Sequence, residues 1–505
     1  MSKHQKKSGT TKKLSTQVVP VIGMSEVVEA ELKSMMQRLG IVRSESYNKL
    51  GSISYWGLDW KKAYPEVRSF RTPESLGLPS KVMEWTVNDV AKAISASQAA
   101  CIEALGKSLH KRFPGKENNQ RRKQCYKQLS SPSFLQCTFL HRIVRKTFKR
   151  GHSWVKNQIV YQQAGYSCKR IYRHTYQLEL AGLRRGKRNR IMVRSNRKLT
   201  GQIRLIYNLQ LQRFEVHFLV DHGTVNVPAE RRSIGVDKGY TEAFYDSDGR
   251  AHGLGLGKLA TAKSNRITKK NRNRGKLWAL HRKLEKIDPA KSARILENNL
   301  SRKTENRRLR KDQAVILAVI GAASKSLFRG ESLKVFAEDL TQPIKGFRLS
   351  WCAFPRSGNP TGVAPQSKAM SRRLNTWMKG AIRDSLQKWA NWTGSVVSEI
   401  QPSYTSQIDS VTGTLLGVRK GDSFTRFNGV VLQADYNAAK NILARGTDQE
   451  ISRFMTRVEV QAVLLRRTAR FLKGMDKSLI DAVELGWLDS KHSKTQAFKE
   501  LLIGT

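Results

Sequence analysis

Three short segments, each with an acidic residue beside an apolar run, constrain the fold of this chain most. They are SIGVDKGYTEAF with Asp237, LKVFAEDLT with Glu338 and LQADYNAAKNI with Asp435. The first two acids end runs typical of buried strands, and the third stands at the start of an amphipathic helical pattern. Roughly a hundred residues separate each acid from the next, so only tertiary structure can bring the three together.

Three carboxylates that meet form a set of hard oxygen ligands. Such ligands suit Mg²⁺, and two Mg²⁺ ions about 3.5–4 Å apart can activate a water and stabilise the leaving oxygen when a phosphodiester is hydrolysed. Taken alone, each acid is more simply a solvated or capping carboxylate, and Asp435 fits an ordinary N-cap. The residues by themselves leave both interpretations open.

The amino-acid sequences of the three segments resemble motifs of a known family. GVDKG at 235–239, AEDL at 337–340 and DYNAAKNI at 435–442 are similar, in order, to the split RuvC-like nuclease of the transposon-encoded TnpB proteins and of compact type V CRISPR effectors. The resemblance covers residues 232–446, and the chain before them matches only in arrangement. It implies an RNA-guided DNA endonuclease whose catalytic acids Asp237, Glu338 and Asp435 bind two Mg²⁺ ions, which Mn²⁺ can replace.

The charge of the chain independently indicates a polyanionic partner. Lys and Arg number 92 against 40 Asp and Glu, a formal net charge of +52. A nucleic acid neutralises such charge most simply, because each neutralised phosphate releases counterions. An anionic membrane is the alternative, but no run approaches the roughly 18 apolar residues of a span, and MSKHQKKSGTTKK lacks the apolar core of a secretory signal. We therefore expect guide RNA and target DNA as partners, no membrane, one protein monomer per guide RNA, and a cytoplasmic, nucleoid-associated location in a prokaryote.

The cysteines argue against a zinc site. The five cysteines are scattered and form no C-x-x-C pair, which disfavours both a disulfide scaffold and a cysteine zinc site. Reduced thiols are the simplest interpretation. TnpB-like proteins usually have two cysteine pairs between the second and third acids. Here those four positions are occupied by Asp409, Thr412, Thr425 and Asn428, and neutral Thr and Asn are poor zinc ligands. The ribbon-like insert should be zinc-free and held by packing of apolar side chains, namely Tyr404, Leu415, Leu416, Phe424 and Phe427.

The expected fold class is α/β with additional α and β parts. Before residue 157, apolar residues recur with the 3.6-residue period of helices, and a helix is expected at 87–112 that Asn88 and Asp89 could cap. After it, apolar residues alternate with the two-residue period of strands. The resemblance implies a bilobed protein with a helical recognition lobe, a wedge-type β-barrel and a split RuvC-like (RNase H-like) nuclease domain. The expected boundaries are 1–23 for a basic N-terminal segment and the start of the wedge, 24–157 for the helical lobe, 158–230 for the wedge, 231–446 for the nuclease and 447–505 for a C-terminal helical extension. Residues 1–14 should be disordered until RNA or DNA is present. Within the nuclease we expect a helical insertion at 262–328, an exposed loop or lid at 356–366 and the ribbon-like insert at 402–430.

Three dense basic runs are the candidate phosphate contacts. A solvated charged face is the alternative for each run, and it is weakest where glycine allows close backbone approach. The candidates are Arg142, Arg145 and Lys146 in the first run; Arg184, Arg185, Lys187, Arg188 and Arg190 in the second; and Lys269, Lys270, Arg272 and Arg274 in the third.

Three other functions remain open from the sequence. A guided binder that no longer cuts would repress a gene or recruit a transposition machine, and the intact acids count against it. An unguided transposase or resolvase would use the same acids without RNA. A structural RNA-binding protein would explain the charge but not the three acids.

Overall fold

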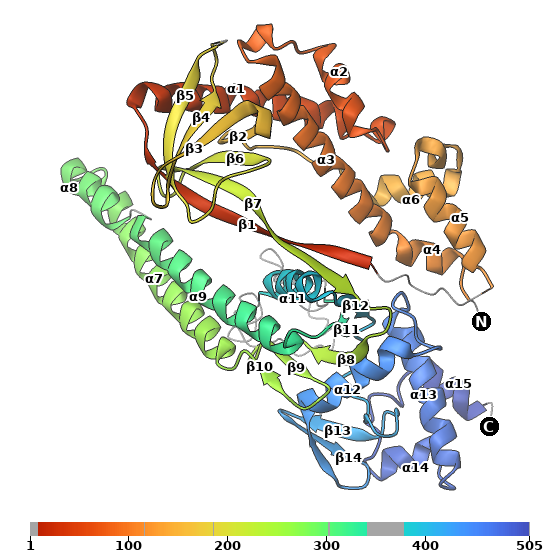
Figure 1. Ribbon diagram of the computed structural model, residues 1–505. Coiled ribbons are helices and arrows are strands. Elements are labelled where there is room, and N and C mark those ends of the chain that lie inside the picture. The colour runs from red at the N-terminus through yellow and green to blue at the C-terminus, as the bar shows by residue number, and fades with distance from the viewer. Residues whose placement is uncertain (1–8, 116, 185, 301–302, 341–377, 504–505) are drawn as a thin grey trace. The chain divides into compact units, whose positions relative to one another are not determined.

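The computed structural model describes residues 9–115, 117–184, 186–300, 303–340 and 378–503 (Figure 1). The chain forms two compact units, one of Leu14–Gly223 and one of Thr224–Thr505 together with Met1–Lys13. The loop expected at 356–366 lies outside the described residues. Within the described residues, no helix combines the length and the apolar character needed to cross a bilayer.

Between strand β1 and strand β2 the first unit is helical, as the period-3.6 patterns predict. The helix α3 begins at Ser80 after Pro79, so the expectation that Asn88 and Asp89 cap a helix at 87–112 is wrong, and both lie in the helix interior. Pro79 fixes the start because proline is tolerated only at the very beginning of a helix. The helices are α1 (Glu26–Leu50), α2 (Ala63–Arg68), α3 (Ser80–Ala104), α4 (Gly106–Arg112), α5 (Asn119–Leu129) and α6 (Thr138–Thr147).

Seven strands of the first unit form one sheet, in the order β2-β6-β7-β1-β5-β4-β3. Strand β1 lies between β7 and β5 and begins at Gly9, so residues 9–14, expected to be disordered until RNA or DNA is present, are strand in this structure without either. Residues 1–8 lie outside the described part. The strands are β1 (Gly9–Gly23), β2 (Gln158–Tyr161), β3 (Tyr166–Tyr172), β4 (Thr175–Ala181), β5 (Arg188–Arg194), β6 (Ile203–Asn208) and β7 (Arg213–Val227).

Helices α1 and α3 pack with this sheet in one apolar core. Leu32 and Met36 of α1, Val87 of α3 and Leu205 of β6 belong to this core, whereas Val27 in the first turn of α1 is exposed. A buried ionic network also ties the helices to the strands: Asp89 accepts hydrogen bonds from Arg43 at 3.0 Å and from Arg204. Asp89 is therefore a partner for two arginines and not a cap.

The second unit contains a five-stranded sheet in the order β10-β9-β8-β11-β12. Strands β8, β11 and β12 run parallel to one another, and β9 and β10 are antiparallel additions at the β8 edge. Since parallel strands need crossover connections, long helical segments must lie between them in sequence. The strands are β8 (Arg232–Asp237), β9 (Phe244–Asp246), β10 (Ala251–His252), β11 (Leu333–Glu338) and β12 (Val396–Ile400).

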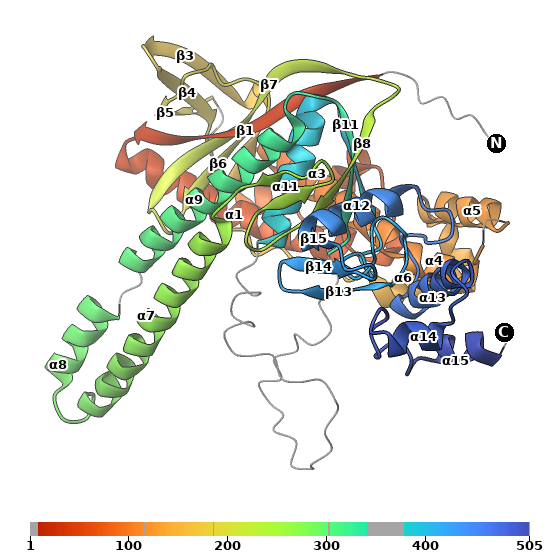
Figure 2. The ribbon, with the colours of Figure 1, turned by 90° about the horizontal axis from the view of Figure 1, so that it is seen from below.

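The helical insertion between the first two acids is a long hairpin. Figures 1 and 2 both place α7 (Leu256–Leu284) beside α9 (Lys303–Phe328), with α8 (Pro289–Arg294) and a π-helical turn (Ile295–Asn299) at the far end. The end of α9 packs on the sheet with α11 (Lys379–Thr393) through Ile316 and Ile320. Val315 is 50% exposed, because consecutive residues of a helix lie about 100° apart and Ile316 takes the position that faces the sheet.

The other face of the sheet is covered by α12 (Ala434–Thr447), with Ile442 packed on Phe336 of β11 and Ile400 of β12. The ribbon-like insert carries a small sheet of β13 (Gly417–Lys420), β14 (Ser423–Arg426) and β15 (Val431–Gln433). The C-terminal helices α13 (Arg457–Lys473), α14 (Leu479–Glu484) and α15 (Gln496–Ile503) share an apolar core with this insert. The stretch 447–505 therefore supports the insert.

Candidate active site

Strand periodicity brings two of the predicted acids to the same face of the sheet. Asp237 is the last residue of β8 and Glu338 the last of β11, and the two strands are parallel neighbours, with Val236 opposite Ala337. Side chains alternate between the faces of a strand, so Asp237 shares a face with Gly235 and Glu338 shares one with Phe336. That face is the one α12 covers.

The third predicted acid comes from α12, which lies unusually close to the sheet. A Cβ on Gly235 would be 2.1 Å from the carbonyl oxygen of Ala439 and 2.5 Å from the backbone N of Leu443. Only glycine therefore allows this helix–strand approach. Asp435 lies in the first turn of α12, whose N-cap is Gln433, so Asp435 is not the N-cap of its helix.

The negative charges of Glu338 and Asp435 act on Asp237. Burial, followed by the negative charges of Glu338 and Asp435, raises the pKa of Asp237 well above its ordinary value. Burial also raises the pKa of Glu338, although Thr405, Lys238, Arg445 and Arg419 oppose that rise. A bound cation would favour the ionised form of Asp237 against this effect.

A positive side chain already contacts one of the acids. Arg419 of β13 donates through Nη2 to Asp435 Oδ1 at 2.8 Å. Among the described residues, no three His, Cys, Asp or Glu side chains gather closely enough to hold a metal ion together. Asp237 and Glu338 end neighbouring strands of the sheet, whereas Asp435 lies on the covering helix and is engaged by Arg419.

The donor chemistry nevertheless fits a hard divalent cation. All three side chains offer carboxylate oxygens, which Mg²⁺ and Mn²⁺ prefer, and neither sulfur nor imidazole is among them. Their mutual repulsion is the electrostatic condition that a bound cation relieves. Asp237, Glu338 and Asp435 thus form a candidate divalent-metal site.

Glu338 is held in place by two groups that sequence reasoning missed. Thr405 Oγ1 donates to Glu338 Oε1 at 2.5 Å, and Lys238 Nζ donates to the backbone oxygen of Glu338 at 2.8 Å. Lys238 is only 6% exposed, and burial lowers its pKa. Its position inside GVDKG, next to Asp237, was the available signal, because a lysine at a buried strand end needs a partner.

One polar face of α12 fixes the beginning of the ribbon-like insert. Asn437 Nδ2 and Asn441 Nδ2 each donate to the carbonyl oxygen of Ile408 at 2.7 Å, and Asn441 Nδ2 also lies 2.9 Å from Thr405 O. Arg445 Nη1 reaches Gln401 O at 3.3 Å, and burial lowers the pKa of Arg445 to about 10. The spacing 437, 441, 445 is the helical i, i+4 repeat, which could have predicted this face.

An ion pair occupies the insert where the family has cysteines. Asp409 is fully buried and accepts from Arg426 Nε at 3.0 Å and from Thr412 Oγ1 at 3.1 Å. The apolar residues expected to hold the insert lie in its interior or pack against it: Tyr404, Leu415, Leu416, Phe424 and Phe427.

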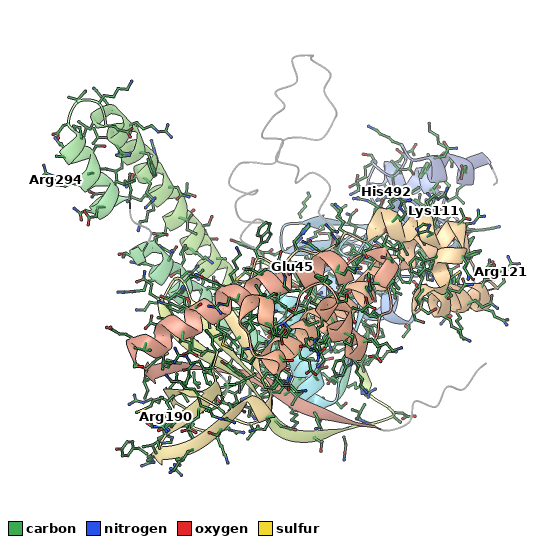
Figure 3. The ribbon with its side chains drawn as sticks, turned by 90° about the horizontal axis from the view of Figure 1, so that it is seen from above. Glu45, Lys111, Arg121, Arg190, Arg294 and His492 are labelled. Atoms are coloured by element: carbon green, nitrogen blue, oxygen red, sulfur yellow. The ribbon has the colours of Figure 1, made fainter. Side chains whose placement is uncertain are left out.

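The predicted phosphate contacts lie on three separate elements. In the first unit, α6 exposes its three candidates, and Arg190 of β5, labelled in Figure 3, pairs with Glu179 at 3.1 Å. Arg185 lies outside the described residues. Two candidates of α7 are engaged within the helical hairpin: Lys270 with Glu305 at 2.6 Å and Arg274 with the carbonyl oxygen of Leu300 at 2.5 Å. The exposed candidates are Arg142, Arg145, Lys146, Arg184, Lys187, Arg188, Arg190, Lys269 and Arg272.

Comparison with known proteins finds a family model, "Cas12f1-like, TNB domain", that matches residues 380–442. This match includes α11, β12, the ribbon-like insert and Asp435, and it confirms the resemblance to compact type V effectors over those residues. A cryo-EM structure of a Cas12f1–sgRNA–target DNA complex is similar at 11% identity, covering 87% of this chain and 100% of that chain with a TM-score of 0.36. No curated protein matches.

Proposed function

We propose that this protein is an RNA-guided DNA endonuclease with a RuvC-like active site. What supports the proposal is that Asp237 and Glu338 end neighbouring parallel strands and that Asp435 lies on the helix that covers the same face. The electrostatic effect of Glu338 and Asp435 on the pKa of Asp237 supports their closeness. A structural RNA-binding protein has no need of such a set.

Asp237, Glu338 and Asp435 would hold Mg²⁺, two ions in the family to which this chain is similar. Bound Mg²⁺ supplies an activated water and stabilises the leaving oxygen of the phosphodiester. The protein's own contribution is orientation. Thr405 and Lys238 fix the carboxylate and the backbone of Glu338, and Gly235 allows α12 to pack close to β8. Arg419 already occupies Oδ1 of Asp435 and would compete with a metal for that carboxylate.

A guide RNA would provide the sequence information, with target DNA as the substrate. In guided nucleases, base pairing reads the target while the protein contacts backbone and a short flanking motif. The net charge of +52 supports a polyanionic partner, and the exposed basic side chains of α6 and of the 184–190 turn are suitable contacts for it. We propose the helices before 157 as the recognition lobe and the seven-stranded sheet as the wedge.

One observation favours a second candidate, a guided DNA-binding protein that does not cut. The Arg419–Asp435 ion pair leaves one of the three acids occupied, and within the described residues no side-chain group is assembled for a metal. If this ion pair persists with DNA bound, the protein binds its target and leaves it intact. The unguided transposase or resolvase has no observation of its own in its favour.

The guide requirement can be tested before any cleavage assay. RNA that copurifies with the full chain should be sequenced. The protein should then be reconstituted with a version of that RNA in which the guide segment is replaced by a chosen sequence. Binding to duplex DNA that contains the chosen target, and not to a scrambled duplex, supports guidance. Equal binding to both duplexes, or no discrete copurifying RNA, contradicts it.

A further inference from the structure

A tryptophan in the first unit is left almost entirely in solvent. Trp154 lies in the connection between α6 and β2, and its 84% exposure is the largest among the large hydrophobic side chains that the structure describes. Tryptophan is usually well buried, because its ring removes more apolar area from water than other side chains do. An exposed indole offers a flat apolar face on which a ligand can stack.

The segment around Trp154 is anchored on α1 at both ends. On one side, Arg150 Nη1 donates to the carbonyl oxygen of Asn48 at 3.3 Å, and a Cβ on Gly151 would lie 3.3 Å from the Tyr47 ring. On the other side, a Cβ on Gly40 would come within 3.0 Å of the Cα of Lys156. The segment thus runs along α1 from Asn48 back to Gly40, with Trp154 between the two anchors.

This anchoring holds the exposed ring on a fixed support. Gly40 allows the backbone at Lys156 to touch the helix, and α1 is itself buried in the main core of the unit through Leu39 and Val42. A ring presented by an ordered segment loses little conformational entropy when a ligand stacks on it, so the support favours binding.

The surroundings of Trp154 are basic. Residues 148–157 read FKRGHSWVKN, with three Lys or Arg residues, one His and no acid. The single acid of α1 between residues 40 and 51 is Glu45, labelled in Figure 3, and Arg71 neutralises it through bonds of 2.5 and 2.8 Å. An exposed aromatic ring among basic residues matches the base and the phosphate of an unpaired nucleotide.

We propose that Trp154 is a stacking platform for an unpaired base of single-stranded nucleic acid, with Lys149, Arg150 and Lys156 beside it for the adjoining phosphates. The proposal rests on nucleic-acid binding by this protein but requires neither a guide nor cleavage. In a duplex both faces of a base are already stacked, so the site should distinguish single strands from duplexes.

The test measures binding of the full chain, freed of nucleic acid in high salt, to labelled oligonucleotides of about 12 nucleotides. EDTA is present so that no strand is cut. Trp154→Leu keeps an apolar side chain without an aromatic face and should weaken single-strand binding by roughly 5- to 150-fold. Trp154→Phe should retain most of the affinity, and duplex binding should change little in either variant. Leu209→Ala, which removes another side chain exposed by 69%, is the matched control and should leave both affinities unchanged.

A second measurement locates the bound strand on the protein directly, without relying on changes in affinity. Single-strand oligonucleotides carrying 4-thiouridine or 4-thiothymidine should crosslink to the peptide that contains Trp154 when irradiated, with RNA and DNA strands run in parallel. Unchanged single-strand affinity in Trp154→Leu, equal losses for single strands and duplexes, or no crosslink to this peptide would each overturn the proposal. Failure of guided cleavage with these results intact would instead count against the proposed nuclease alone.

Discussion

Arg419 Nη2 lies 2.8 Å from Asp435 Oδ1, so a side chain of the ribbon-like insert contacts the third acid of the candidate active site. The positive charge of Arg419 also lowers the pKa of Asp237 and of Glu338, against the stronger effect of burial. Arg419 thus supplies part of the charge that a divalent cation would supply. The insert therefore acts directly on the electrostatics of the three acids.

This contact predicts competition between Arg419 and Mg²⁺. In Arg419→Gln the carboxylate of Asp435 is no longer paired, and we expect the Mg²⁺ concentration at half-maximal binding to fall roughly tenfold, equivalent to about 1.4 kcal/mol. Calorimetric titration of the full chain with Mg²⁺ measures this directly. The control is Lys420→Ala, which removes the same charge from the neighbouring exposed residue. An unchanged or weaker affinity in Arg419→Gln would show that the arginine does not compete with metal.

Gly235 should be intolerant of any side chain. A Cβ there meets the backbone of α12, which cannot yield without moving Asp435, so Gly235→Ala should destabilise the protein by about 1–3 kcal/mol and abolish cleavage. Chemical denaturation measures the first effect. Gly275→Ala is the opposite control, because nothing lies within 4 Å of a Cβ at this position in α7, and it should stabilise the helix by about 0.5–1 kcal/mol. Equal stability of the two variants would contradict the close helix–strand packing.

The buried pair of Asp409 and Arg426 should hold the insert without zinc. Asp409→Ala leaves the guanidinium of Arg426 without its buried partner, and we expect a loss of about 3–5 kcal/mol in the free energy of unfolding. Asp422→Ala, an exposed acid of the same insert, should have little effect. Elemental analysis of the wild type should find no stoichiometric zinc. One tightly held zinc per chain would mean that the insert is organised by other ligands.

His492 should make stability depend on pH. Burial, together with the charge of Lys491, lowers the pKa of His492 to about 4 from an ordinary 6.5, and Gln461 Nε2 lies 2.9 Å from its Nδ1. Between these values the unfolded chain binds the proton that the folded protein excludes, so this contribution is full above pH 6.5 and is lost as the pH falls toward 4. The loss is on the order of 3 kcal/mol.

Urea unfolding at several pH values measures this dependence. In His492→Asn the unfolding free energy should fall less between pH 6.5 and 4 than in the wild type, while the exposed His152→Asn should behave as the wild type. Parallel pH profiles for His492→Asn and wild type would show that His492 is not excluded from protonation in the folded state.

The positions of the three acids could be predicted from sequence because each stands at the boundary of a strongly patterned element. Apolar runs ending at Asp237 and Glu338 predict strand ends, and the two residues are indeed the last of β8 and β11. The insertion was predicted as helical, but not its hairpin form, since the periodicity of α7 and α9 does not specify which faces meet. Val315 and Val458 are exposed although they are apolar, because apolar side chains of their helices also occur outside the buried face.

The supporting groups of the site could not be predicted, because they depend on contacts between segments far apart in the chain. Thr405 reaches Glu338, and Arg419 reaches Asp435, only after the insert has folded back on α12 through Asn437 and Asn441. The pairing of Asp409 with Arg426 could not be predicted from the sequence for the same reason. Sequence alone indicated that zinc ligands were missing there, but not what replaces them.

The most direct test of the account is guided cleavage of a labelled duplex in Mg²⁺ by the protein with its copurifying RNA. The wild type should cut, and Asp237→Asn, Glu338→Gln and Asp435→Asn should each lose cleavage while retaining guided binding, because each removes one carboxylate from the candidate metal site. Asp384→Asn, an exposed acid of α11, should cut as the wild type does. Cleavage by any of the three variants at the wild-type rate would contradict the assignment of the active site, and guided binding by a wild type that leaves its target uncut would favour the non-cutting alternative.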